Sequence, residues 1–389
     1  MMRAFSLRCL ASWLVAGVLL AGCEREPAAP PGPSPEAIAA AEQRMIDRLF
    51  VGHIVPGVAA FAARADELAA AAGAFCAARD ETRFGALQDA WRNTALAWQP
   101  IRWLQTGPGS DQHRMLRIDA WPQARLDLVA TRVRQLLASS QAVDAVAIAD
   151  QPVHLQGLPA LETLLFEDRG PADFAADAAG DRRCALVVGI AGNLAGIGSA
   201  QERLWRGGLE GGTTANSIFV SAGGAAVPPH NVINQLGNLL MQQLVELKDV
   251  AIGAPLGIST TGEIFPPRPR LAHSWRSRIS LQRVLASLES VAAVYSGGAD
   301  DANGLDDLLA LRGAESVATE FEALLAASLE QARALLDDGV TIYEGAGNED
   351  EHARLAELRN RVRDLEIQVQ LEMMSALEVV LTFNFADGD

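Results

Sequence analysis

The sequence lacks the short motifs that mark the common hydrolase and nucleotide-binding sites. It has no Gly-x-Ser-x-Gly elbow for a serine nucleophile and no glycine loop that would cradle a phosphate. It also has no His-Glu-x-x-His pair that would hold a catalytic zinc, and its six histidines are scattered along the chain. No catalytic set can therefore be identified from motifs.

Charge and hydropathy argue against three further classes of protein. The formal net charge of −16 argues against a nucleic-acid partner, because phosphates demand a basic face. A hydrophobic content of 49% excludes a disordered chain, and beyond the N-terminal segment we expect no apolar run of membrane-spanning length. Lysine is almost absent, since Lys248 is the only one, and we interpret this first as codon composition.

The N-terminus carries the pattern of a secretory signal peptide. Arg3 and Arg8 precede an apolar run over residues 10–20, which is too short to span a bilayer. A Leu-Ala-Gly-Cys box ending at Cys23 closes the run, with small residues before the cysteine. We therefore predict that residues 1–22 are a lipoprotein signal peptide.

The pattern after the leader predicts a lipid anchor and a spacer. Cys23 would become the lipidated N-terminus, and Glu24 after it, rather than aspartate, favours the outer membrane of a Gram-negative cell. The prolines within residues 23–35 predict a semi-rigid extended tether. We expect a chain attached by its lipid to the periplasmic side of the outer membrane.

Cysteine is scarce outside the leader. Apart from Cys9 and Cys23, only Cys76 and Cys184 are present. In an oxidising compartment these two cysteines would form a single disulfide. The alternative is a pair of small buried thiols, because the sequence does not supply the distance between them.

Helical periodicity dominates the chain from residue 36 onward, and sustained strand alternation is absent. We therefore predict an all-α protein. The expected helices span residues 36–55, 58–78, 82–105, 124–137, 181–205, 230–252, 277–295, 305–311, 315–336 and 348–381. Pro56 and Pro100 predict a kink or a short break, and Asp119 before Trp121 and Pro122 predicts a helix start.

A glycine-rich segment divides the chain into two halves. Residues 207–228 have a composition that we expect to hold no helix, and we place a domain junction there. The N-terminal domain would span residues 36–206 and the C-terminal domain residues 229–389, each with about four long helices. The simplest architecture that fits these helices is two similar four-helix bundles packed against each other.

Residues 157–166 combine a glycine turn, a proline and a single carboxylate at the start of an apolar helix. Pro159 fits the first turn, because its missing N–H would have no intrahelical partner there. Glu162 would fall within that first turn, near the positive end of the helix dipole. Because its neighbours are apolar, we expect it to be partly buried and to need a partner. It is either a structural acid paired with an arginine or a functional carboxylate.

The same stretch resembles the signature of the imelysin-like family, which typically reads Gly-x-His-x-x-Glu. Gly157 and Glu162 match this signature, whereas Pro159 stands where the histidine would be. The likeness covers nearly the whole mature chain. Three further blocks carry it, at residues 91–107, 269–280 and 383–389, the last reading Phe-Asn-Phe-Ala-Asp-Gly-Asp.

The resemblance implies two similar four-helix bundles with a functional site where they meet. It adds further site residues to Gly157, Pro159 and Glu162, namely Trp275, Arg276, Ser277, Asn384 and Asp387. Glu162 is the one candidate worth testing as a metal ligand. Arg276 is a candidate partner for it, because a guanidinium matches a carboxylate in two-point contact, and an interdomain ion pair without a ligand is the alternative.

Two histidines, His154 and His273, also lie close to the family blocks. Family members are exported bacterial proteins linked to iron uptake, so the resemblance implies a non-enzymatic binding or accessory role in iron or haem acquisition. Iron-uptake proteins of the envelope would be its partners.

Two alternatives remain open. The first is a metallopeptidase, the activity for which the family was named. Against it, Pro159 removes a ligand that a catalytic zinc would need. The second is a structural envelope protein that binds nothing.

Overall fold

The computed structural model describes residues 32–110, 113–122, 125, 127–166, 169–210, 214–220, 226–298 and 303–382, without the side chains of 208–210. Residues 33–389 form one compact unit. The predicted signal peptide 1–22, Cys23, most of the tether, Asn384 and Asp387 lie outside the described residues.

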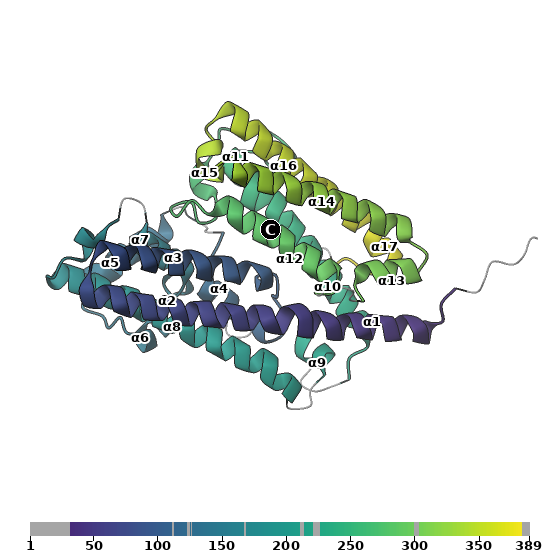
Figure 1. The fold of residues 1–389 in the computed structure, drawn as a ribbon, viewed down its shortest axis with the longest axis horizontal. Coiled ribbons are helices and arrows are strands. Elements are labelled where there is room, and N and C mark those ends of the chain that lie inside the picture. The colour runs from purple at the N-terminus through teal and green to yellow at the C-terminus, as the bar shows by residue number, and fades with distance from the viewer. Residues whose placement is uncertain are drawn as a thin grey trace, which may run out of the picture. The chain divides into compact units, whose positions relative to one another are not determined.

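Within the described ranges the regular structure is helical, which confirms the predicted all-α class. An isolated β-bridge joins Ile258 and Ile264 and belongs to no strand. Two groups of long helices can be followed in Figure 1. That they are two similar four-helix bundles stays a prediction.

The first group is built around α2 (Val55–Ala78), which packs against α3 (Glu81–Trp98) and the long α8 (Ala178–Glu210) (Figure 1). Asp80 caps α3 by accepting a hydrogen bond from the amide of Arg83. Three shorter helices pack against this group, α5 (Leu128–Ala138), α6 (Ala145–Ala149) and α7 (Leu158–Leu165).

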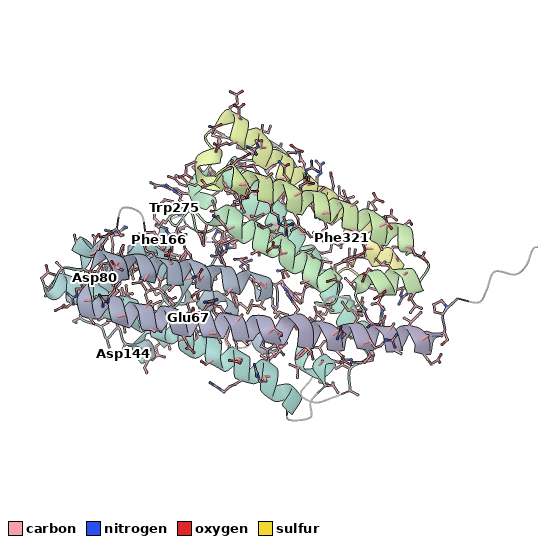
Figure 2. The ribbon with its side chains drawn as sticks, viewed as in Figure 1. Glu67, Asp80, Asp144, Phe166, Trp275 and Phe321 are labelled. Carbon is pink, nitrogen blue, oxygen red and sulfur yellow. A yellow bond between two sulfur atoms is a disulfide. The ribbon has the colours of Figure 1, made fainter. Side chains whose placement is uncertain are left out.

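The second group contains four long helices, α10 (Pro229–Val245), α12 (Ser280–Tyr295), α14 (Glu315–Asp337) and α16 (Glu349–Gln368). Helix α14 contacts both α12 and α16, and α10 contacts α16. Phe321, labelled in Figure 2, is fully buried, with its ring centroid 4.5 Å from that of Tyr295.

Helix α1 (Pro35–Leu49) packs against α10 and against α13 (Leu305–Leu311). The remaining short helices are α4 (Arg114–Ile118), α9 (Ala215–Phe219), α11 (Ala254–Leu256), α15 (Ile342–Gly345) and α17 (Met374–Ala376).

Prolines alter two of the predicted helices. Before Pro56, a π-helical turn over Phe50–Ile54 joins α1 to α2, and the amide of Val55 donates to the carbonyl of Phe50. The expected kink is therefore a π turn, which accommodates a local break in the ladder without ending the helix. At Pro100 the helix does end, because α3 gives way to a 3-10 turn over Gln99–Ile101.

The expectation that residues 207–228 hold no helix is wrong. Helix α8 continues to Glu210, and α9 lies inside this segment. Thr214 caps α9 by accepting from the amide of Ser217, and the buried Asn216 exchanges hydrogen bonds with Gln43 on α1 at 2.9 and 3.0 Å. Glycine costs only about 1 kcal/mol in a helix, so such tertiary contacts override composition. The domain junction itself stays a prediction.

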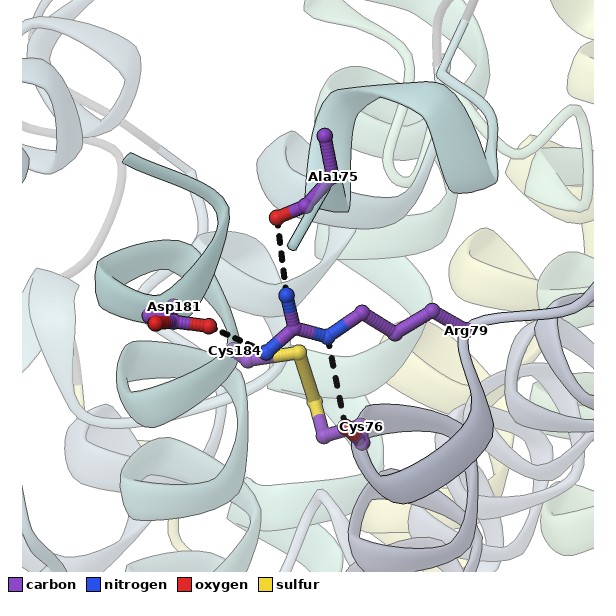
Figure 3. Close-up of a disulfide and its surroundings, with 5 residues drawn as sticks. All are labelled: Cys76, Arg79, Ala175, Asp181 and Cys184. Atoms are coloured by element: carbon purple, nitrogen blue, oxygen red, sulfur yellow. Dashed lines mark hydrogen bonds and ion pairs between the residues drawn. A yellow bond between two sulfur atoms is a disulfide. The ribbon is translucent and has the colours of Figure 1, made fainter. Parts of the chain in front are cut away.

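The disulfide between Cys76 and Cys184 is present, and its Cα atoms lie 5.6 Å apart. It joins the last turn of α2 to the first turns of α8, as Figure 3 shows. Beside it, Arg79 donates to the carbonyl oxygens of Ala175 at 2.7 Å and Cys76 at 3.3 Å, and pairs with Asp181. These contacts attach the chain that precedes α8 to the end of α2.

By length and composition alone, two helical stretches could cross a membrane, residues 35–78 and 178–207. The expectation that no such run follows the leader is therefore wrong on this criterion. However, 50% and 61% of their most apolar windows are buried inside the protein. Core helices of soluble proteins pass the same test, so these stretches are weak evidence for a membrane span.

Candidate functional site

A close backbone contact positions the start of α7. A Cβ atom added at Gly157 would lie 2.1 Å from the carbonyl oxygen of Ile118 and 2.4 Å from that of Arg117. Only glycine leaves room for this approach. It places the start of α7 against the end of α4, and therefore beside the segment that begins at Asp119.

Glu162 is buried, with 5% of its surface exposed, as its apolar neighbours predicted. The sequence predicts Glu162 in the first turn of this helix, and that expectation is wrong. Helix α7 begins at Leu158, and its first turn holds no acidic residue. The helix dipole falls off within the first turn, so Glu162 depends on other partners.

Those partners come from Ser277. One oxygen of Glu162, Oε1, accepts from the amide of Ser277 at 3.0 Å and from its hydroxyl at 2.9 Å. Burial nevertheless raises the pKa of Glu162 above its ordinary value of 4.5, because desolvation outweighs the Ser277 hydrogen bonds and the positive charge of Arg276. Both donors of Ser277 thus reach one oxygen of Glu162, which differs from the two-point contact considered for Arg276. The guanidinium of Arg276 lies over the ring of Trp275, 4.3 Å from its centroid.

A second buried carboxylate, Asp119, lies at the same site and was not predicted as a functional residue. It accepts from His273 Nε2 at 3.0 Å and forms an ion pair with Arg283, and Arg102 Nε lies 3.9 Å away. Burial alone would raise the pKa of Asp119, but Arg283 and His273 hold it well below its ordinary value. Asp119 is therefore ionised. The helix start predicted at Asp119 is wrong, because α5 begins only at Leu128.

Arg283 connects this carboxylate to its surroundings. The side chain is almost fully buried on α12 and donates to Ser274 Oγ at 2.7 Å. With its amide in the orientation that satisfies its neighbours, Gln99 accepts from Arg283 and donates to Ser287 Oγ at 3.0 Å. A buried guanidinium is stable here because its donors are paired.

His273 is neutral at physiological pH. Burial, with a smaller effect from the nearby Arg283, lowers its pKa to about 3. Because ionised Asp119 can only accept, Nε2 of His273 carries the ring proton, and Nδ1 is left as an acceptor. The ring stacks on Trp121 with centroids 4.1 Å apart and planes 6° apart.

Trp275 forms an aromatic wall on the C-terminal half of the chain. It is 8% exposed and stacks on Tyr343, with ring centroids 5.4 Å apart. The guanidinium of Arg270 lies 5.3 Å from its centroid in a cation–π contact. Figure 2 labels Trp275 and also Phe166, which follows α7 and whose ring centroid lies 5.0 Å from that of Trp91.

These residues surround a cavity of about 60 Å³, which we call the Glu162 cavity. It has room for a few water molecules or the end of a small ligand. Its walls are Trp91, Leu158, Pro159 and Glu162 from α3 and α7, Asp119, Trp121 and Pro122, and Val250, Ala254, residues 270–276 and Arg283 from the C-terminal half. A larger cavity of about 390 Å³ shares Asp119, Trp121 and Pro122 with it.

The residues that the structure describes do not form a metal centre of their own. Within the described part of the chain, no three His, Cys, Asp or Glu side chains are placed to hold an ion. Glu162 Oε1 and both oxygens of Asp119 already accept hydrogen bonds. Pro159 lines the cavity at the position where the imelysin-like signature has a histidine. A catalytic zinc needs three protein ligands, and this set of side chains does not supply them.

The structure brings most of the predicted site residues together. Pro159, Glu162, Trp275 and Arg276 line the cavity, while Gly157 positions α7 and Ser277 bonds to Glu162. Asn384 and Asp387 lie outside the described residues. His273 is part of the cavity wall, and His154 is not.

Sequence reasoning missed the roles of Asp119, Trp121 and Arg283. Asp119 resembled a helix start and Arg283 lay inside a helical stretch. No local pattern in the sequence could have paired Asp119 with Arg283, because these two residues lie 164 positions apart.

The family model described as Imelysin, Peptidase_M75, matches residues 54–369 of this chain. A comparison with curated proteins found no match. The solved structure of an imelysin-like protein from Psychrobacter arcticum has 21% identity and a TM-score of 0.71, and the match covers 89% of this chain and 98% of that one. A protein proposed to be an iron-regulated protein A precursor, from Parabacteroides distasonis, has 17% identity and a TM-score of 0.66, covering 87% and 96%. These structures share the fold.

Proposed function

The chain belongs to the imelysin family, and on that basis we propose that it is a non-enzymatic binding protein of iron acquisition, with its site at the Glu162 cavity. The observation that carries the proposal is a buried, hydrogen-bonded carboxylate facing a cavity that both halves of the chain line. An ionisable group in such a place is characteristic of binding sites. The iron-related role is supported by the resemblance to an iron-regulated protein A precursor.

The size of the cavity favours a small ligand. A small iron complex could place one end in a cavity of about 60 Å³. Binding to the folded state would stabilise it, by about 2.7 kcal/mol at a ligand concentration 100 times Kd.

Thermal unfolding of the full chain with ferric chloride, ferric citrate and haem tests the proposal. We expect at least one iron source to raise the melting temperature, and Ala254→Leu, which adds volume at the cavity wall, to remove the effect. Ala293→Leu, a partly exposed alanine on α12 outside the cavity, is the matched control and should keep it. If no iron source stabilises the wild-type chain, the proposed function is wrong.

The metallopeptidase alternative predicts a different result. It requires metal-dependent cleavage of a protein substrate, lost in Glu162→Gln. Detection of such cleavage would overturn the non-enzymatic part of the proposal, whereas indifference to every ligand would favour the structural envelope alternative.

Export and anchoring are part of the same proposal. We infer that residues 1–22 are removed, that Cys23 is lipidated, and that residues 23–35 tether the binding unit to the periplasmic side of the outer membrane. The Cys76–Cys184 disulfide supports an oxidising compartment, where structural disulfides persist. Iron-uptake proteins of the envelope would be partners in this location.

A further inference from the structure

The charged side chains around the Glu162 cavity are unequal in number. Three guanidinium groups line it, those of Arg270, Arg276 and Arg283, against two carboxylates, Asp119 and Glu162, among the described residues. Asp119 is ion-paired with Arg283. His273 adds no charge at neutral pH, because burial lowers its pKa to about 3. The described lining therefore holds one more guanidinium than carboxylates.

Arg270 is the exposed arginine of the three. Its guanidinium is exposed and contacts the face of Trp275, and no carboxylate of the described residues pairs with it. The ring holds the guanidinium at the cavity wall, since a cation is attracted to the face of tryptophan. The five donors of an arginine remain largely available to a ligand.

We propose that the Glu162 cavity takes a carboxylate group of a small organic acid, with the Arg270 guanidinium as the side chain that pairs with it. Guanidinium and carboxylate match in a bidentate contact, which a hydrated cation cannot make. The inference rests on the proposed function, because it names the class of ligand that the iron-related site would bind.

The rest of the cavity fits such a ligand better than a bare cation. Trp121 and Leu271 give it apolar wall for the carbon atoms of an organic acid. Glu162 has its Oε1 occupied by Ser277, and burial favours its neutral form, so it repels an anion little.

Two sources could supply the carboxylate, a free organic acid or the anionic complex of ferric iron with that acid. Isothermal titration of the full chain with sodium citrate, ferric citrate and ferric chloride distinguishes them. We expect ferric citrate to bind and ferric chloride to bind more weakly or not at all. Binding of free citrate as tightly as ferric citrate would identify the acid itself as the ligand.

Matched variants test the role of Arg270. Arg270→Gln should weaken citrate or ferric citrate binding by about fivefold or more, as expected for an exposed ion pair and its hydrogen bonds. Arg268→Gln, an exposed arginine two residues away and outside the cavity, should leave the affinity unchanged.

The outcomes separate this inference from the proposed function. Ferric chloride binding that is lost in Glu162→Gln and kept in Arg270→Gln would overturn the carboxylate ligand and leave an iron-binding site. Equal binding of free citrate and ferric citrate would support the carboxylate and contradict the iron-related role. No binding of any probe would overturn both.

Discussion

At the scale of single residues, burial decides the charge states in the Glu162 cavity. Burial raises the pKa of Glu162 and lowers that of His273, so both groups favour their neutral forms. Asp119 remains ionised, because Arg283 and His273 compensate its desolvation. Two carboxylates at one site thus have opposite tendencies, and the difference follows from which of them has a buried guanidinium as its partner.

The neutral His273 predicts a pH dependence of stability. In the unfolded chain a histidine takes up a proton near its ordinary pKa of 6.5, whereas folded His273 does so only near pH 3. The unfolded state therefore binds more protons between these values, and stability falls as the pH drops below 6.5. Urea unfolding between pH 7 and pH 4 should show a weaker dependence in His273→Gln, by a few kcal/mol, since one pKa unit corresponds to about 1.4 kcal/mol.

A matched variant separates this effect from the loss of any histidine. His113→Gln removes an exposed histidine and should keep the wild-type slope. Equal slopes for wild type and His273→Gln would show that His273 is protonated in the folded state at these pH values, contrary to its buried position.

At the scale of elements, the contact between the start of α7 and the end of α4 positions the Glu162 cavity. The close approach of Gly157 to the carbonyl oxygens of Ile118 and Arg117 sets this contact. Glu162 on α7 and Asp119 after α4 therefore reach the same cavity. A shift of α7 would move the carboxylate away from Ser277.

Gly157→Ala is expected to be destabilising. The added methyl group would lie 2.1 Å from the carbonyl oxygen of Ile118, and such overpacking costs about 1–3 kcal/mol or more. Gly85→Ala on α3, where no atom lies within 4 Å, should be neutral or stabilising by up to about 1 kcal/mol. Urea unfolding of both variants measures the difference. A neutral Gly157→Ala would show that α7 does not rest on α4 in solution.

At the scale of the whole molecule, the Glu162 cavity depends on long-range pairs. Asp119 lies 154 positions from His273 and 164 from Arg283, and Glu162 lies 115 positions from Ser277. Each pair has one member before α8 and one after it, so the cavity exists only when both parts of the chain are folded. Binding at this site and global stability should therefore be linked.

Anchoring of the whole chain is predicted to depend on Cys23. In a Gram-negative host, Cys23→Ser should move the protein from the outer-membrane fraction to the soluble periplasmic fraction and abolish labelling by a fatty acid. Cys9→Ser, which changes the other leader cysteine, should leave both unchanged. Persistence of Cys23→Ser in the membrane with its lipid label would exclude this anchor.

Local patterns in the sequence determined most of the long helices and the location of the central stretch. Apolar periodicity predicted the all-α class, Leu305–Leu311 was predicted with its observed bounds, and the scarcity of cysteine left one bridge, between Cys76 and Cys184. The imelysin-like blocks brought Glu162, Trp275 and Ser277 together as candidates. These features depend on residues near in sequence or on types too rare to pair otherwise.

Tertiary structure alone decided which groups meet and in what charge state. It gave Glu162 two hydrogen bonds from Ser277, both to one oxygen, and it joined Asp119 to His273 and Arg283. The same packing overrode composition at α9, where contacts with α1 hold a helix in a glycine-rich segment. Hydrogen bonds and desolvation depend on distances of a few ångströms, which arise when remote segments pack and have no counterpart in local sequence patterns.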